Sequence, residues 1–142
     1  MLEKDAVLSK ISIIKNCLNT INRVTGFKPE KLDDFIKHDV FVLYLQRAIQ
    51  ACIDISNIII AKKGYKLPAS YKESFVILEQ NKFLEKDLAD KIISMVDFRN
   101  MAVLDYREIS IDILQSILLN NMKDFEEFYS IVYSKIDELL DL

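Results

Sequence analysis

The chain has 142 residues, of which 51% are hydrophobic and 29% charged, a composition typical of one globular domain spanning residues 1–142. Only two glycines and two prolines occur, which favours a few long helices over a sheet, because sheets need frequent turns. The net charge of -3 argues against broad nonspecific binding of nucleic acid, since such binding depends on many lysines and arginines. A local basic cleft, or a basic groove in a dimer, is compatible with this charge.

In the first half of the chain, apolar residues recur every three or four positions, as they do on one face of a helix. The first such run covers Val7 to Ile21, and Thr25-Gly26 is a typical C-terminal stop. A second helical pattern covers Lys31 to Lys63, with a short kink or break near His38-Asp39. Two long helices are therefore expected before residue 64.

Local end signals define the helices of the second half. Ser70 to Glu73 matches a capping box, which predicts a third helix from about Tyr71 to near Asn81. A fourth helix is expected from about Leu84 towards Val103. Ser110 is a candidate N-cap for the final region, Ile111 to Leu142, which forms one long helix or two nearly continuous ones. The expected architecture is a single all-α, up-and-down bundle of four to five helices.

The sequence offers little for a metal site or a membrane segment. Cys17 and Cys52 lie on apolar helix faces, and there is no Cys-x-x-Cys motif and only one histidine, His38. Two reduced, buried thiols are favoured over a thiolate or zinc site, and we expect no metal. The first residues do not resemble a secretory signal, and no apolar run approaches 18 residues, so a cytoplasmic protein without membrane association is expected.

An arginine interrupts the apolar stripe of the fourth helix. One face of that helix carries Leu88, Ile92, Met95, Arg99, Ala102 and Tyr106. A guanidinium stays charged, and burying it without a partner would cost several kcal/mol. Arg99 is therefore expected either to form an interior ion pair that fixes helix register, which periodicity alone favours, or to bind an anion.

The second helix carries a polar stripe that matches this arginine. Its members are Gln46, Gln50, Asp54 and Asn57, with Arg47 alongside. Such a stripe either faces solvent, which the sequence alone favours, or lines a shared cleft. Our hypothesis is that Asp54 lies close enough to orient or neutralise Arg99, and that Asp54 and Arg47 support the cleft.

The stretch from Met95 to Tyr106 resembles the Arg-Asn-x3-His-x-Tyr signature of the HEPN superfamily, in its HepT branch of small toxin ribonucleases. Arg99, Asn100 and Tyr106 match this signature. Leu104 stands at the position of the histidine.

The resemblance extends beyond the signature over nearly the whole chain. Leu45 to Asn57 resembles the second-helix pattern of the family, in which an Ile-Asp pair recurs. Leu67 to Tyr71, followed by Phe75, resembles its connecting loop and third helix. Each match is weak alone, but their order and spacing together are specific.

The resemblance implies a helical homodimer in which the signature arginine and histidine of both subunits meet in an intersubunit cleft. It also implies a metal-independent endoribonuclease without a cofactor, with transfer RNA among the family's targets, and Arg99, Leu104 and Asn100 as the catalytic positions. Histidine is the proton-transfer group near pH 7, and Leu104 cannot replace it. The chain is thus expected to be weakly active or inactive, through an attenuating substitution or natural decay. His38 is expected to be a surface or capping residue rather than a substitute base.

Family members of this kind are usually encoded beside an antitoxin of the MntA type, a small nucleotidyltransferase. The resemblance implies that this partner silences the toxin by transferring AMP from ATP to the signature tyrosine, here Tyr106. The added anion would then lie beside Arg99 and repel RNA. The expected function is the toxin half of a toxin–antitoxin system. The alternatives are a noncatalytic module that docks a nucleotidyltransferase and a helical adaptor without affinity for RNA.

Overall fold

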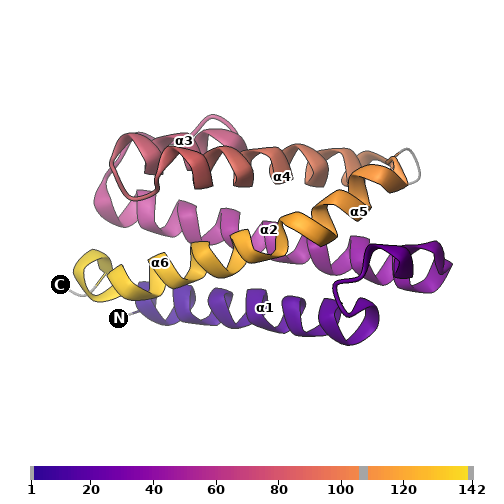
Figure 1. Ribbon diagram of the computed structural model, residues 1–142. Helices are drawn as coiled ribbons and strands as arrows, with labels where there is room; N and C mark the ends of the chain where they lie inside the picture. Colours follow the sequence, from indigo (N-terminus) through magenta and orange to yellow (C-terminus); the bar gives the residue numbers. More distant parts are fainter. Residues whose placement is uncertain (1, 106–108, 141–142) are drawn as a thin grey trace.

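The computed structural model describes residues 2–105 and 109–140, and all regular structure in these residues is helical (Figure 1). The elements are α1 (Leu2–Thr25), the 3-10 helix η1 (Pro29–Asp33), α2 (Phe35–Lys63), α3 (Tyr71–Gln80), α4 (Lys86–Asp105), α5 (Ile111–Asn120) and α6 (Met122–Leu140). The expected all-α bundle is confirmed. Six α-helices exceed the expected four to five, because the final region divides at Asn121 into α5 and α6.

Helix α2 lies at the centre of the bundle, in contact with α1, α3, α4, α6 and η1 (Figure 1). A helix surrounded in this way must be apolar on most of its circumference. Twelve of its residues are buried, including Phe41, Leu45, Ile53 and Ile59. The start of α1 and the end of α6 lie at the same end of the bundle (Figure 1). None of the helices in the described residues is long and apolar enough to cross a membrane.

Several helix ends follow the local signals in the sequence. Gly64 has a φ of 68° and closes α2 in the left-handed conformation that glycine adopts without strain. The hydroxyl of Ser70 accepts a hydrogen bond from the backbone N–H of Glu73, as the capping box predicts. In turn, the Glu73 carboxylate accepts from the backbone N–H of Ala69, one residue before the cap. Ser110 caps α5 through the backbone N–H of Asp112.

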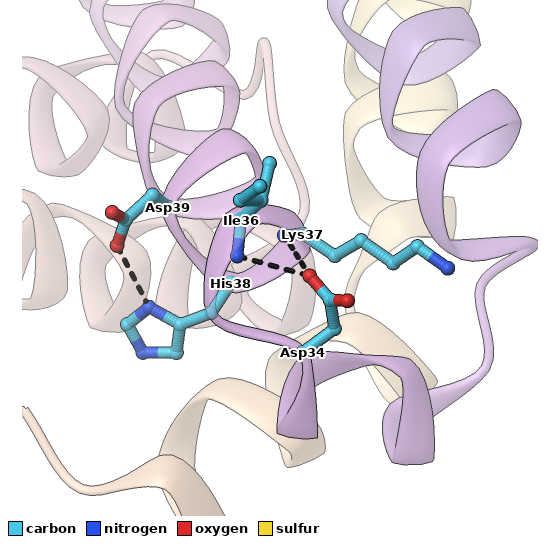
Figure 2. A network of polar contacts seen from close by, with 5 residues as sticks. All are labelled: Asp34, Ile36, Lys37, His38 and Asp39. Carbon is cyan, nitrogen blue, oxygen red and sulfur yellow. Dashed lines mark hydrogen bonds and ion pairs between the residues drawn. The ribbon is translucent and has the colours of Figure 1, made fainter.

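The kink or break expected near His38-Asp39 is wrong. The chain breaks earlier, because the carboxylate of Asp34 accepts hydrogen bonds from the backbone N–H groups of Ile36 and Lys37 and so begins α2 at Phe35 (Figure 2). His38 and Asp39 then belong to the first turns of an uninterrupted helix. The expected boundary at Lys31 falls instead within η1.

The apolar stripe of α4 is confirmed and sets the position of the signature. Leu88, Ile92, Met95 and Ala102 are each at most 5% exposed, and they face the core between α2, α3 and α6. Arg99 lies on the same stripe and is half-buried. Its side chain therefore points to the region where α2 and α3 pack on α4.

Candidate functional site

Three neutral side chains surround the guanidinium of Arg99. Its Nη2 donates to Oε1 of Gln50 on α2 over 2.6 Å, and its Nη1 donates to Oδ1 of Asn100 over 3.5 Å. Its central carbon lies 5.1 Å from the ring centroid of Tyr71, the first residue of α3. The Nε atom is buried and has no hydrogen-bond partner. Among the described residues, no carboxylate pairs with Arg99, so its positive charge is not neutralised locally.

This arrangement bears on the two interpretations of Arg99. An interior ion pair, which periodicity alone favoured, requires a carboxylate at the guanidinium, and the described residues supply an amide there instead. A charge held only by amides and an aromatic face remains free to attract an anion. An anion-binding role for Arg99 stays a prediction.

The carboxylate of Asp54 is linked to Arg99 by two hydrogen bonds that share Gln50. Its Oδ1 accepts a hydrogen bond from Nε2 of Gln50 over 2.9 Å, and its Oδ2 lies 3.0 Å from Nζ of Lys10 on α1. Asp54 thus contacts Gln50, which in turn contacts Arg99, and an orienting role for Asp54 stays a prediction. Direct neutralisation, the other half of our hypothesis, is not what the geometry shows, because Asp54 pairs with Lys10.

A polar pocket of about 420 Å³ opens beside these residues. It is lined by Asn57, Pro68, Ala69, Ser70, Tyr71, Ser74 and Asn100. The hydroxyl of Ser74 donates to Oδ1 of Asn57 over 2.7 Å. The favoured expectation of a solvated stripe on α2 is therefore wrong at Gln50 and Asn57, which contact α4 and α3. It failed because α3 folds back over this part of α2.

Arg47 is not among the contacts of Arg99. Its guanidinium lies 5.0 Å from the ring of Tyr44 on the same helix, and it is exposed. Its charge opposes the effect of burial, which raises the pKa of Cys17 on α1. Its expected support of the cleft stays a prediction.

The other candidate positions of the signature lie close to Arg99 in the chain. Asn100 is exposed and contacts Arg99. Leu104 belongs to the last turn of α4, and Tyr106 lies outside the described residues. The roles of these positions in catalysis and modification are taken up below as proposals.

His38 and the cysteines are placed apart from this site. Nδ1 of His38 lies 3.2 Å from Oδ1 of Asp39 on the first turns of α2 (Figure 2). It precedes Gln50 by twelve residues, a rise of roughly 18 Å along the helix. Cys17 and Cys52 are free and buried, and burial raises the pKa of both thiols. No cluster of three or more potential metal ligands occurs among the described residues.

Sequence reasoning missed two members of the site. Lys10 carries no signal in the sequence beyond its place on a polar face of α1, and its pairing with Asp54 depends on how α1 packs on α2. Tyr71 was identified as the start of a helix and as part of the Leu67–Tyr71 resemblance, but not as a contact of Arg99. An aromatic residue directly after a capping serine, at the start of a helix that precedes the signature, is the one signal that could have indicated it.

Comparisons with known proteins identify the family of this chain. The chain matches the family described as ribonuclease HepT-like over residues 14–132, and it belongs to that family. The mRNA nuclease HepT of Shewanella oneidensis is 37% identical over 128 residues, which are 90% of this chain and 96% of that protein.

Two solved structures resemble the fold, each with a TM-score of 0.86. One is a toxin–antitoxin complex with AMP-PNP, 35% identical to this chain. The other is the tri-AMPylated HEPN toxin of Shewanella oneidensis in complex with its MNT antitoxin, 36% identical. Each match covers 92% of this chain and 98% of the other.

The neutral surroundings of Arg99 predict a small effect of its removal on stability. Arg99→Met is expected to change the free energy of unfolding by less than about 1.5 kcal/mol, because no ion pair is broken and methionine suits the stripe. Urea unfolding followed by circular dichroism measures this change, with Arg23→Met on the exposed face of α1 as the baseline. A loss of about 3–5 kcal/mol, typical of a broken buried ion pair, would contradict this account.

Proposed function

We propose that this chain is the toxin component of a toxin–antitoxin system and that it binds RNA for endonucleolytic cleavage through Arg99. The observation that carries the proposal is the guanidinium held by neutral partners beside a polar pocket. A phosphodiester would supply the missing negative charge, through parallel hydrogen bonds from the guanidinium. The similarity to an mRNA nuclease supports RNA as the polyanion. The chain would act in the cytoplasm, where RNA and ATP are both present.

Cleavage without a metal would use the 2′-hydroxyl as nucleophile. The reaction then needs a base for the hydroxyl proton, an acid for the leaving oxygen and positive charge at the phosphate. Arg99 supplies the charge, and Asn100 supplies a polar contact beside it. Leu104 cannot transfer a proton. Since a positioned general base contributes about 10²–10⁴-fold, we propose that this chain binds RNA but cleaves it slowly.

Restoring the histidine tests this division between binding and chemistry. Leu104→His is expected to raise the rate of RNA cleavage by about 10²-fold or more, because an imidazole five residues after Arg99, at the position of the signature histidine, can accept the proton. The rate is measured by gel electrophoresis of end-labelled RNA. The double variant Leu104→His/Arg99→Ala serves as the control, and we expect it to cleave RNA no faster than the unchanged chain. A histidine variant no more active than the unchanged chain would sink the attenuated-nuclease proposal.

The partner is proposed to be a nucleotidyltransferase antitoxin that modifies Tyr106. Similar proteins occur in complexes described as toxin–antitoxin with AMP-PNP and as tri-AMPylated toxin with MNT antitoxin. Tyr106 follows Arg99 by seven residues in the sequence. An adenylyl group on this tyrosine would place phosphate near the guanidinium and compete with RNA for it.

Tyr106→Phe is expected to abolish transfer of AMP by the MntA-type partner, because phenylalanine has no hydroxyl to accept the adenylyl group. Intact-mass measurement after incubation with antitoxin and ATP reports the number of AMP groups added. Tyr133→Phe, at an exposed position of α6, is the matched control and is expected to be modified like the unchanged chain. Equal labelling of Tyr106→Phe would assign the acceptor to another residue.

We further propose a homodimer formed on the exposed face of α2. Ile36 and Leu43 are 70% and 45% exposed, and Leu43 lies two turns before Gln50 on the same face. Two copies that meet on this apolar face would bring their Arg99 side chains to one cleft and double its positive charge. Resemblance to the HEPN superfamily supports this arrangement.

Leu43→Asp is expected to shift the dimer towards monomer, because the contact would bury an unpaired carboxylate. Analytical ultracentrifugation at several concentrations measures the shift. Val76→Asp, at a similarly exposed position of α3, provides the comparison and is expected to leave the mass unchanged. A monomeric unchanged chain, or a Leu43 variant that stays dimeric, would rule out this face.

The second candidate function is a noncatalytic module that docks the nucleotidyltransferase. Leu104 favours it, because the position of the general base is lost while the arginine and tyrosine of the signature are kept. This candidate predicts AMP transfer to Tyr106 together with no cleavage by the Leu104→His variant.

A further inference from the structure

The contacts of Arg99 continue through three helices as one chain of polar groups. Lys10 on α1 pairs with Asp54, Asp54 accepts from Gln50 on α2, and Gln50 accepts from Arg99 on α4. The separations are 3.0, 2.9 and 2.6 Å, each within hydrogen-bond or ion-pair distance. Each link joins groups that are half-buried, so solvent competes with it only in part.

From these polar contacts we propose that Gln50 is a positioning residue, which fixes the guanidinium of Arg99 for phosphate without cancelling its charge. The inference rests on the proposed RNA-binding function of Arg99 and extends it to residues outside the signature. Asp54 and Lys10 act through Gln50 and are positioning residues of the same kind.

The orientation of the Gln50 amide depends on Asp54. An amide carries an acceptor oxygen on one side and a donor nitrogen on the other. A carboxylate accepts hydrogen bonds only, so Asp54 must face the nitrogen of the amide. The oxygen of Gln50 is then directed to Arg99. With the opposite orientation, the NH₂ group would face the N–H groups of the guanidinium, two donors against each other.

The charges of these polar groups explain why an amide lies between Asp54 and Arg99. A carboxylate in direct contact with Arg99 would hold the guanidinium equally well, but it would also neutralise the charge that a phosphate needs. Here the charge of Asp54 is opposed by Lys10, and the residue that touches Arg99 is neutral. Tyr71 covers one face of the guanidinium, also without opposing its charge.

Two substitutions at Gln50 separate position from charge. Gln50→Met removes the hydrogen bond and keeps the site neutral. Gln50→Glu keeps an acceptor at Arg99, adds a negative charge and replaces the donor to Asp54 by a carboxylate oxygen, so its charge is held by direct pairing with Arg99. Gln115 on α5 is the matched control, since it is also half-buried and also makes one hydrogen bond, from Nε2 to the backbone oxygen of Pro29. Gln115→Met and Gln115→Glu repeat the same changes away from Arg99.

The first measurement reports the order of the guanidinium itself. The ¹⁵N heteronuclear NOE of the Arg99 Nε–H group, assigned by its absence from Arg99→Ala, should show a rigid group in the unchanged chain. We expect Gln50→Met to lose this rigidity, and Gln50→Glu and both Gln115 variants to keep it. A guanidinium as rigid in Gln50→Met as in the unchanged chain would overturn the proposal.

The second measurement is affinity for a labelled single-stranded RNA with 2′-O-methyl groups, which cannot be cleaved through the 2′-hydroxyl. Both Gln50 variants are expected to bind this RNA about tenfold more weakly. In Gln50→Met the guanidinium of Arg99 is no longer held in place, and in Gln50→Glu the new carboxylate neutralises its positive charge. The Gln115 variants should change affinity by less than about twofold, as expected for surface positions remote from the ligand. If Gln50→Glu binds RNA as Gln115→Glu does, the proposal is wrong.

Arg99→Ala separates this proposal from the function on which it rests. If Arg99→Ala binds RNA as tightly as the unchanged chain, the proposed function of Arg99 fails, and the NOE comparison still decides whether Gln50 orders the side chain. If Arg99→Ala loses affinity and the Gln50 variants do not, Arg99 binds RNA and Gln50 is only a structural neighbour.

Discussion

The proposed function depends on one interaction at the signature, a guanidinium that is held firmly but not neutralised. The hydrogen bond of Arg99 to the Gln50 amide, its contact with Asn100 and its stacking on Tyr71 fix the side chain from three helices. None of these partners carries a charge that opposes the guanidinium. A protein that needed only stability at this position would place an apolar residue on the stripe, as it does at Met95 and Ala102. The arginine therefore indicates function.

The surrounding fold provides the rigidity that such an arrangement needs. Helix α2 is buried on most sides and contacts α1, α3, α4, α6 and η1, so the position of Gln50 is fixed by packing. Helix α4 is anchored by the apolar stripe that includes Leu88 and Ile92. Arg99 lies where these two helices meet α3, and small changes in helix packing would therefore alter its contacts.

The sequence predicted the elements of this fold better than the contacts of the site. Apolar periodicity and end signals such as Gly64 and Ser70 are local, and they identified the central and third helices correctly. The contact partner of Arg99 was expected to be Asp54, since a carboxylate is the usual partner of an arginine. The structure places Gln50 there, one turn earlier. One turn is about 5.4 Å along a helix, and only the packing of α2 against α4 decides between the two.

Membership of the HepT-like ribonuclease family and the loss of the signature histidine are reconciled if binding and chemistry are separate properties of this chain. Arg99, Gln50 and Tyr71 suit the binding of a phosphate, which does not require proton transfer. Leu104 removes only the group that would transfer the proton. On the proposed function, such a chain would bind RNA and a nucleotidyltransferase while cleaving RNA slowly.

The most direct test is the salt dependence of RNA binding with and without Arg99. Each phosphate contact contributes about 0.7 to the slope of log affinity against log salt for a single-stranded nucleic acid. Arg99→Ala should therefore give a shallower slope by about 0.7 for each guanidinium engaged, whereas Arg23→Ala on α1 should give the slope of the unchanged chain. Equal slopes for Arg99→Ala and the unchanged chain would contradict the claim that this guanidinium meets phosphate.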